Sequence, residues 1–300
     1  MCDIVRGVRV SGTRTGSIAI ENICKSFKVG NYLGTDRRTL GRRFSAERMA
    51  ANYLFRPPYP AEVYETLLEL MGARPRVLLD AGCGTGKITL ALLDQIDRAD
   101  AVDPSDAMLQ VARSLAGADT KKIRWIHSVI EDAPFDPPYG LVVAASSIHW
   151  MNLDRTLPRF ADALADGAML AVLDGDAPVD APWGREETAF MIDFLEAREG
   201  RRPPWWKSVS ERLETPVLEH SMFEPVGHRV TAPAKFSQSI ADYLRCQHSR
   251  ATWSEEHLGE KASAEFDGAM TTILNRHARD GMLTYNVQTR IEWGKVGRQG

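Results

Sequence analysis

Three glycines at alternate positions follow an acidic residue and precede an expected helix. Residues 76–87 read RVLLDAGCGTGK, with Asp80 ahead of Gly82, Gly84 and Gly86. Glycine at such a turn permits a positive φ and lets a ligand approach the backbone, because no Cβ stands in the way. The free N–H groups at the start of the next helix point back toward the turn. This arrangement predicts a nucleotide-binding turn.

The glycine spacing separates two classes of nucleotide site. The dinucleotide fingerprint is G-x-G-x-x-G, whereas this chain reads G-x-G-x-G, with the third glycine one position early. Asp80 lies two residues before the first glycine, where its carboxylate would repel a pyrophosphate and favour a cationic group. The sequence therefore favours a nucleoside ligand with a cationic end over a nicotinamide dinucleotide.

A second acidic residue, Asp103, ends the next predicted strand, residues 99–103. Ligands of open parallel sheets bind outside the carboxyl ends of the strands, and an acid there accepts hydrogen bonds from both ribose hydroxyls of a nucleoside. Asp103 makes the interpretation of the glycine turn more specific.

The pattern D-x-G-x-G-x-G with its downstream acid resembles class I S-adenosylmethionine-dependent methyltransferases. The resemblance implies that S-adenosylmethionine is the cofactor, with its amino-acid end held by Asp80 and the glycine turn and its ribose by Asp103. It places the adenine against Met108, Ile130 and Glu131, although Met108 is equally explained as a core residue. The family often has an aspartate where this chain has Val129.

A proline-rich stretch precedes the first predicted strand: residues 53–60 read YLFRPPYP. Proline interrupts helices, so the segment is extended or turned. The stretch is similar to Y-x-x-R-P-x-Y-P in methyltransferases of small acids, the trans-aconitate or type 11 group. That resemblance implies that Arg56 and Tyr59 bind the cofactor or the substrate; the alternative is a linker in which Tyr59 only packs.

His149 is the candidate catalytic residue. It follows the predicted fourth strand, residues 141–146, and Ser146 at the strand exit is a candidate cofactor-binding residue. A histidine pKa near ~6.5 suits a general base, and the small-acid enzymes carry a similar H-W pair. A carboxylate acceptor is already ionised and needs no base, so His149 is either catalytic or a structural hydrogen-bonding residue.

Residues 136–139 read DPPY, the catalytic motif of methyltransferases that modify exocyclic or amide nitrogens. In those enzymes the motif lies at the exit of the fourth strand, whereas here it precedes that strand. Because a motif counts only in its structural context, we predict a proline-rich turn.

The apolar pattern predicts alternating strands and helices, and therefore a doubly wound α/β sheet. The resemblance implies a seven-stranded, mostly parallel sheet with a substrate cap of helices around residues 182–216 and 237–280. The expected strands are 77–79, 99–103, 123–126, 141–146, 168–173, 223–230 and 283–291. The later helices are expected at 185–199, 240–247 and 255–279.

Two segments fall outside this pattern. Residues 1–43 are rich in Gly, Ser, Thr and Arg without a sustained period, so we expect a flexible basic arm ahead of a methyltransferase domain at 44–300. Residues 201–207 read RRPPWWK, which predicts a packed loop, with a substrate lid as the alternative.

Composition excludes several classes of protein. The net charge of −3 argues against a nucleic-acid-binding surface. The four scattered cysteines suggest reduced thiols, with neither a disulfide framework nor a zinc site. No apolar run approaches the ~18 residues of a membrane span, and no secretory signal is evident. We expect a cytoplasmic monomer or homodimer without a metal.

The expected function is methyl transfer from S-adenosylmethionine to a small molecule, on a carboxylate or a hydroxyl. One alternative is a nonmethylating cofactor-binding protein of the same fold, which would bind the cofactor without turnover. The other is a nucleic-acid or protein methyltransferase, for which RNA binding would weaken steeply with salt.

Overall fold

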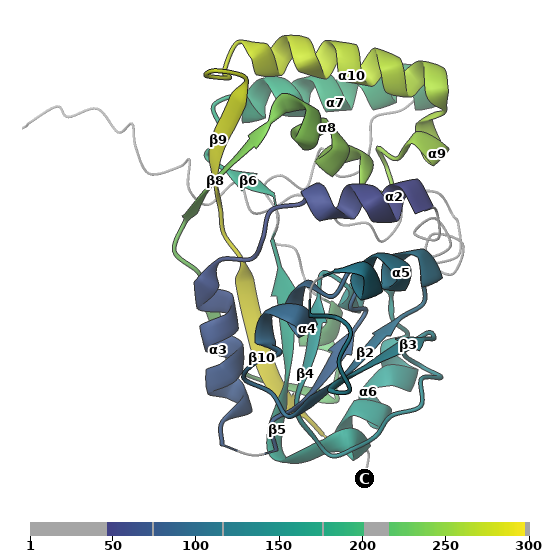
Figure 1. Cartoon of the computed structure of the whole chain (residues 1–300), viewed down its shortest axis with the longest axis vertical. Helices are drawn as coiled ribbons and strands as arrows, with labels where there is room; N and C mark the ends of the chain where they lie inside the picture. Colours follow the sequence, from purple (N-terminus) through teal and green to yellow (C-terminus); the bar gives the residue numbers. More distant parts are fainter. Residues whose placement is uncertain (1–46, 74, 116, 176, 201–215, 298–300) are drawn as a thin grey trace, which may run out of the picture.

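The computed structural model describes residues 47–73, 75–115, 117–175, 177–200 and 216–297. The predicted arm at 1–43 and the segment 201–207 lie outside these residues. Figure 1 shows two parts, a sheet with its helices below and a layer of helices above. We call the upper part the cap.

A seven-stranded sheet forms the lower part, in the order β3-β2-β1-β4-β5-β10-β7. Strands β1 to β5 pair with one another in parallel, and β10 is antiparallel to both β5 and β7. The predicted doubly wound, mostly parallel sheet is confirmed. Its strands are β1 (Val77–Ala81), β2 (Arg98–Asp103), β3 (Ile123–His127), β4 (Tyr139–Ala145), β5 (Leu164–Asp174), β7 (Phe223–Val230) and β10 (Arg290–Val296).

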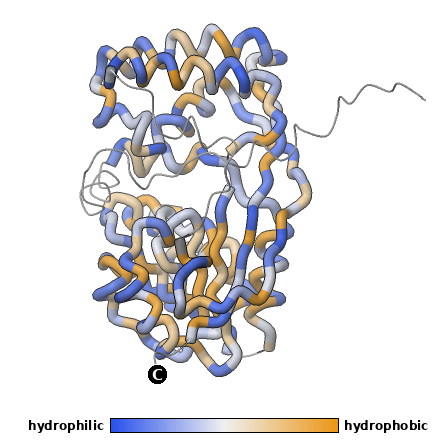
Figure 2. The backbone as a smooth tube through the Cα atoms, turned by 180° about the vertical axis from the view of Figure 1, so that it is seen from behind, coloured by the Kyte–Doolittle hydropathy of each residue, from blue (hydrophilic) through white to orange (hydrophobic). Residues whose placement is uncertain are grey.

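Helices cover both faces of this sheet, and the two-residue period of β1 explains how. Leu79 packs in one cluster with Phe160. Leu78 points to the other face and packs with Leu67 and Ile88. Each such side chain contributes roughly 1.5–3 kcal/mol when buried, and Figure 2 shows the apolar strands running through the lower part. The helices are α3 (Ala61–Met71), α4 (Lys87–Leu92), α5 (Asp106–Ser114) and α6 (Leu153–Ala163).

The cap has its own small sheet, in the order β6-β9-β8, and its own aromatic core that includes Trp183, Trp253 and Phe266. Helix α2 (Glu47–Asn52) lies between the cap and the lower part (Figure 1). Among the described residues, no helix has the length and apolar character to cross a membrane. The cap elements are β6 (Pro178–Val179), α7 (Gly184–Glu199), β8 (Ala234–Ser239), α8 (Ile240–His248), α9 (Glu255–Leu258), α10 (Glu260–Asn275) and β9 (Met282–Val287).

A hydrogen-bonded neck joins the small sheet to the large one. The Thr231 N–H donates to the Thr289 carbonyl at 3.0 Å, and the Thr289 N–H donates to the Thr231 hydroxyl at 3.1 Å. The Thr289 hydroxyl also donates to the Gly175 carbonyl at 3.1 Å. The neck therefore ties together the crossings that follow β5, β7 and β9.

Two predictions of element boundaries are wrong. The alternation predicts one strand at 283–291, but the chain leaves the small sheet after Val287 and enters the large one at Arg290, because the neck interrupts the pairing. The helix expected at 255–279 is two helices, α9 and α10, separated by Gly259, whose φ is +78°. The second helix ends at Asn275.

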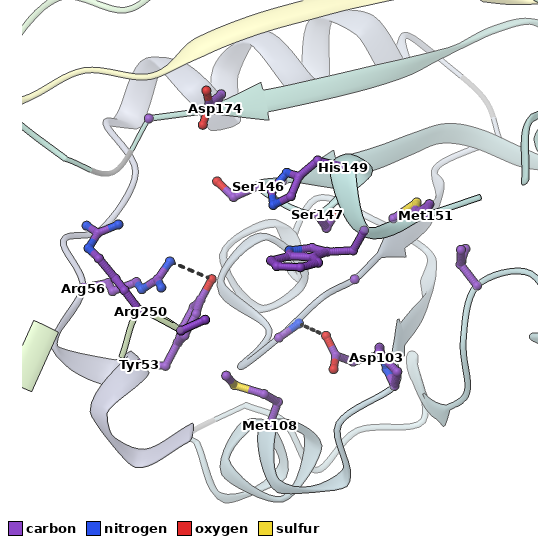
Figure 3. A pocket seen from close by; sticks show the side chains of 18 of the residues that line it. Tyr53, Arg56, Asp103, Met108, Ser146, Ser147, His149, Met151, Asp174 and Arg250 are labelled. Carbon is purple, nitrogen blue, oxygen red and sulfur yellow. Dashed lines mark hydrogen bonds between the residues drawn. The ribbon is translucent and has the colours of Figure 1, made fainter. Parts of the chain in front are cut away.

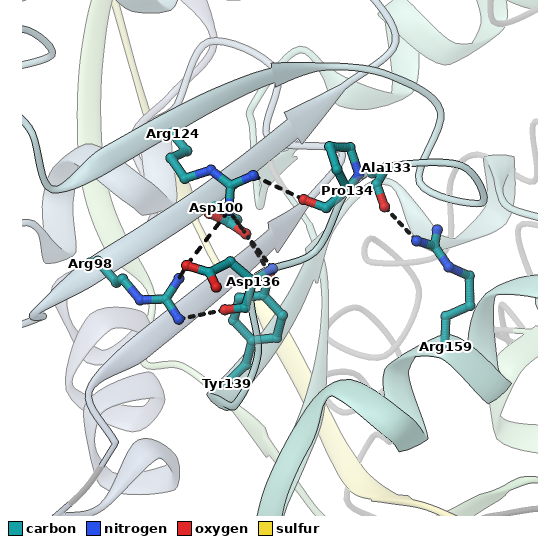
Figure 4. Close-up of polar contacts among 8 residues, drawn as sticks. All are labelled: Arg98, Asp100, Arg124, Ala133, Pro134, Asp136, Tyr139 and Arg159. Carbon is teal, nitrogen blue, oxygen red and sulfur yellow. Dashed lines mark hydrogen bonds and ion pairs between the residues drawn. The ribbon is translucent and has the colours of Figure 1, made fainter.

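The DPPY motif lies at the start of β4, at the amino ends of the parallel strands (Figure 4). The Tyr139 hydroxyl donates to buried Asp100, and the Asp136 N–H donates to that hydroxyl at 2.8 Å. The Arg98 guanidinium pairs with the Asp136 carboxylate at 2.9 Å. These contacts fix a turn, as the position of the motif before its strand predicts.

The turn after β1 requires glycine at position 82. Its φ is +74°, and a Cβ there would lie 2.5 Å from the Ser147 Cβ. Gly200, the residue after α7, offers a matched comparison, because it is left-handed with a φ of +68° but a Cβ at that position would have nothing within 4 Å. Backbone conformation and crowding can therefore be separated experimentally.

We predict that Gly200→Ala lowers the free energy of unfolding by ~1–2 kcal/mol, the cost of the left-handed backbone alone. Gly82→Ala should cost a further ~1–3 kcal/mol, because the added methyl group overpacks against Ser147. Urea unfolding of both variants measures the difference. Equal losses would show that Ser147 does not restrict position 82.

Candidate active site

A pocket of about 230 Å³ lies at the carboxyl ends of the parallel strands, between the large sheet and the cap (Figure 3). Its lower wall comes from the turns after β1 and β2, and its far wall from the segment after β4. Arg250, Ala251 and Thr252 contribute the cap side. The pocket therefore lies where ligands bind in open α/β sheets.

The structure brings most of the predicted site residues to this pocket. Nine of the twelve line it: Arg56, Gly82, Gly84, Asp103, Met108, Ile130, Glu131, Ser146 and His149. The other three, Tyr59, Asp80 and Gly86, lie outside the lining.

Asp103 joins the two turns at the pocket floor. Its Oδ2 accepts a hydrogen bond from the Gly84 N–H and its Oδ1 from the Ser105 N–H, each at 2.8 Å. Burial raises the pKa of Asp103 to about 6, and the two backbone hydrogen bonds oppose that rise. Each carboxylate oxygen has a further lone pair, so Asp103 retains acceptor capacity for hydroxyl groups in the pocket.

Asp80 faces helix α4 because it lies on the same side of β1 as Leu78. Its Oδ2 accepts hydrogen bonds from the Thr89 N–H at 3.2 Å and the Thr89 hydroxyl at 2.7 Å. Its Oδ1 is buried and has no hydrogen-bond partner among the described residues. Burial raises the pKa of Asp80 to about 6. The structure thus places Asp80 as a support of the turn and of α4.

Packing explains why Gly86 and Tyr59 lie elsewhere. Gly86 precedes α4 with a φ of +79°, and a Cβ there would lie 2.7 Å from the Trp125 ring. Tyr59 packs against the apolar cluster that includes α3 and α4. A role of Tyr59 in binding the cofactor or the substrate stays a prediction.

Arg56 connects the segment before α3 to the cap. Its Nε donates to the Ser249 hydroxyl at 2.7 Å and its Nη2 to the Ser249 carbonyl at 2.9 Å. Its guanidinium lies 4.1 Å from the centre of the Tyr53 ring, which also lines the pocket. Lys87 fastens the backbone below by donating to the Arg56 carbonyl at 3.0 Å and the Pro57 carbonyl at 2.9 Å.

The segment after β4 holds His149 at the pocket. Ser146 has a φ of +51°, uncommon for a residue with a side chain, and its N–H donates to the Leu173 carbonyl at 2.9 Å. The Ser147 hydroxyl donates to the Ala81 carbonyl at 2.6 Å. His149 and Trp150 follow, with ring centres 4.8 Å apart, and both line the pocket.

Glu131 has a structural contact as well as a place in the lining. Its Oε1 accepts from the Asn152 N–H at 2.7 Å, just before α6. Asn152 in turn caps that helix, because its side chain accepts from the Arg155 N–H. Glu131 therefore ties the third-strand exit to the fourth-strand exit.

Sequence reasoning missed several lining residues, including Tyr53, Asp174, Arg250 and Gln288. Asp174 ends β5, so the strand-exit rule that identified Asp103 applies to it as well. Arg250 carries no such signal, because it comes from a turn of the cap whose contact with the sheet depends on the whole fold.

Comparison with known proteins identifies the segment that carries the glycine turn. Residues 78–167 match a family described as a methyltransferase domain. A Saccharomyces cerevisiae protein named for S-adenosylmethionine-dependent methyl transfer is 33% identical over 117 residues, covering 37% of this chain and 40% of that protein. A malonyl-[acyl-carrier protein] O-methyltransferase of Geobacter sulfurreducens is 32% identical over 152 residues, covering 47% of this chain and 55% of the enzyme.

The chain thus spans about half the length of the curated relatives it matches. Solved structures agree on the fold. A protein of Anaeromyxobacter dehalogenans, described as a type II methyltransferase, superposes with a TM-score of 0.58 at 22% identity, covering 81% of this chain and 99% of that one.

The raised pKa values of Asp80 and Asp103 predict how stability depends on pH. Between the ordinary value near 4 and about 6, the folded protein binds more protons at these groups than the unfolded chain does. Their contribution therefore lowers the stability of the ligand-free protein as pH rises through this range.

Asp103→Asn removes one of these titrations. We predict that its free energy of unfolding, measured in urea without ligand, falls less steeply than that of the wild type as pH rises from about 4 to 6. Between about pH 4 and 6, the free energy of unfolding of the wild type should fall by roughly 1–3 kcal/mol more than that of the variant. Asp119→Asn, at an exposed acid, serves as the control and should follow the wild type. Identical slopes for all three proteins would contradict the prediction.

Proposed function

We infer that this chain is an S-adenosylmethionine-dependent methyltransferase that acts on a small molecule through an oxygen acceptor. The observation that carries the proposal is the placement of Asp103. Its carboxylate ends β2 and is held by the Gly84 N–H at the floor of the pocket. This geometry fits the resemblance stated from the sequence and the match of residues 78–167 to a methyltransferase domain.

The lining residues fit the parts of S-adenosylmethionine. Asp103 accepts hydrogen bonds from the ribose hydroxyls, while Met108 and Ile130 provide apolar contacts for the adenine. Gly82 and Gly84 expose backbone to the amino-acid end, and Arg56 supplies a cation for its carboxylate. When bound, the cofactor supplies a methyl group on a positively charged sulfur, which makes that methyl electrophilic.

Three of the predicted residues have supporting roles in this proposal. Asp80, Gly86 and Tyr59 shape the turn and its surroundings without lining the pocket. The buried Oδ1 of Asp80, unpartnered among the described residues, favours a nearby cationic or N–H group.

The acceptor is oriented from the cap side. Arg250 lines the pocket from the cap, and a guanidinium binds a carboxylate with two parallel hydrogen bonds. A carboxylate is ionised at neutral pH and needs no base, so positioning against the methyl group is sufficient. For a hydroxyl acceptor, His149 takes the role of general base.

The curated relatives support an oxygen acceptor. Two of them, from Acetivibrio thermocellus and Geobacter sulfurreducens, are named malonyl-[acyl-carrier protein] O-methyltransferases. Because this chain matches about half of each, its own acceptor is proposed from the pocket rather than taken from those names.

Cofactor binding tests the proposal through Asp103. We predict that Asp103→Ala weakens the affinity for S-adenosylhomocysteine at least about tenfold, because hydrogen bonds to a charged group contribute ~1.5–3 kcal/mol each. Isothermal titration calorimetry measures the change. Asp119→Ala, at an exposed acid on the loop before β3, is the matched control and should bind like the wild type. Unchanged affinity in Asp103→Ala would contradict the assignment.

Acceptor recognition is tested through Arg250. With a panel of small carboxylic acids and malonyl thioesters, we predict that Arg250→Ala raises KM about tenfold or more, because a charge-assisted hydrogen bond is lost. S-adenosylhomocysteine affinity should change little. Arg245→Ala is the control, since this arginine of α8 stacks over the Phe55 ring. Turnover is measured as the formation of S-adenosylhomocysteine.

Two results would count against this acceptor proposal. An Arg250→Ala enzyme with normal KM for every acid would show that the cap does not read a carboxylate. Tight cofactor binding without product from any acceptor would favour the nonmethylating alternative.

A further inference from the structure

One short segment of the cap, residues 249–252, contributes to two sides of the pocket. It follows α8, and its residues Arg250, Ala251 and Thr252 line the cavity. Its first residue, Ser249, accepts two hydrogen bonds from Arg56 through its hydroxyl and its carbonyl. A contact that holds residues 249–252 in place therefore also holds the cap side of the pocket and the Arg56 guanidinium in place.

His248 is buried, directly precedes this segment in the chain and contacts Trp253, the residue that directly follows it. Its Nδ1 lies 2.6 Å from the Trp253 carbonyl oxygen, and its Nε2 lies 2.8 Å from the Asp267 Oδ1. Both partners are acceptors. A neutral imidazole has one N–H and can donate to only one of them, whereas an imidazolium donates to both. The geometry thus calls for the doubly protonated ring.

We propose that His248 is a positioning residue that acts as an imidazolium. It bridges the Trp253 carbonyl to the Asp267 carboxylate and so holds residues 249–252 against the pocket, with Arg56 attached through Ser249. The proposal rests on the proposed function only in the choice of ligand that reports on the pocket.

The surroundings of His248 favour its charged form. Burial alone lowers its pKa, but the hydrogen bond to Asp267, the Trp253 carbonyl and the charge of Glu255 together leave the pKa above its ordinary value. Asp267 contacts the ring from α10. The charge of Glu255 acts on it from α9, and Glu255 also pairs with Arg48 of α2. The Phe266 ring, 5.8 Å from the imidazole centre, supplies an apolar neighbour.

The sign of the pH dependence follows from that raised pKa. The contribution of the imidazolium is complete at low pH and is lost as pH rises through the pKa of the folded protein. The neutral ring must release one of its two acceptors. A buried acceptor without a donor is costly, and release of the Trp253 carbonyl frees the end of the pocket-lining segment.

The protonation state is tested directly by nitrogen-15 NMR of the imidazole rings. The His248 signals are assigned as those missing from His248→Gln. We expect both ring nitrogens to be protonated at about pH 7, above the ~6.5 at which an ordinary histidine is half titrated. A neutral tautomer at that pH would overturn the proposal, whatever the protein binds.

The positioning role is tested by S-adenosylhomocysteine affinity as a function of pH, between about pH 6 and 8.5. In the wild type we expect affinity to fall about tenfold, equivalent to ~1.4 kcal/mol, as His248 loses its proton. Asp267→Asn keeps an acceptor but removes the charge, so the midpoint should move to lower pH. His248→Gln should bind weakly with no such transition.

A matched control uses another histidine–carboxylate pair. His220 lies 3.1 Å from the Asp154 carboxylate, outside the cap, so His220→Gln should keep the wild-type profile. If His248→Gln fails to fold, Asp267→Asn still decides the matter, because an unchanged midpoint would overturn the proposal. A wild-type protein that binds no S-adenosylhomocysteine at any pH would contradict the proposed function, and the NMR titration would then judge His248 alone.

Discussion

The hydrogen bond from the Gly84 N–H to the Asp103 carboxylate is the contact on which the site depends. It joins the turn after β1 to the end of β2, 2.8 Å from nitrogen to oxygen, at the floor of the pocket. The carboxylate is largely buried, and the Gly84 and Ser105 N–H groups that donate to its oxygens stabilise its ionised form. Parallel pairing of β1 with β2 brings the two groups together.

The upper half of the site depends on a different principle. Arg56 comes from the segment before the sheet, and its partner Ser249 comes from the cap, so neither element alone forms this wall. By donating to both the hydroxyl and the carbonyl of Ser249, the Arg56 guanidinium sets the distance between its own segment and the cap. The floor of the pocket is thus built by local turns, and the wall beside the cap by long-range contacts.

The same division explains what the sequence could predict. Continuous apolar runs such as residues 141–146 predict buried parallel strands. The positions of Asp103 and His149 at the ends of such strands then predict that both residues lie at the pocket. Alternation along β1 also turns Asp80 toward α4, yet the family pattern alone suggested that it faces the ligand. Arg250 lies in no recognisable motif, and it lines the pocket only because the cap packs over the sheet. The break between β9 and β10 at the neck could not be predicted, because the alternating pattern of residues 283–291 continues across it.

The neck has a consequence for how the molecule comes apart. Thr289 holds the crossings after β5 and β7 by hydrogen bonds, and β10, which starts one residue later, lies inside the large sheet between β5 and β7. Unfolding of the cap would therefore disturb β10, an interior strand of the large sheet. We expect the two parts to melt as one cooperative unit, with a calorimetric enthalpy matching the van't Hoff value.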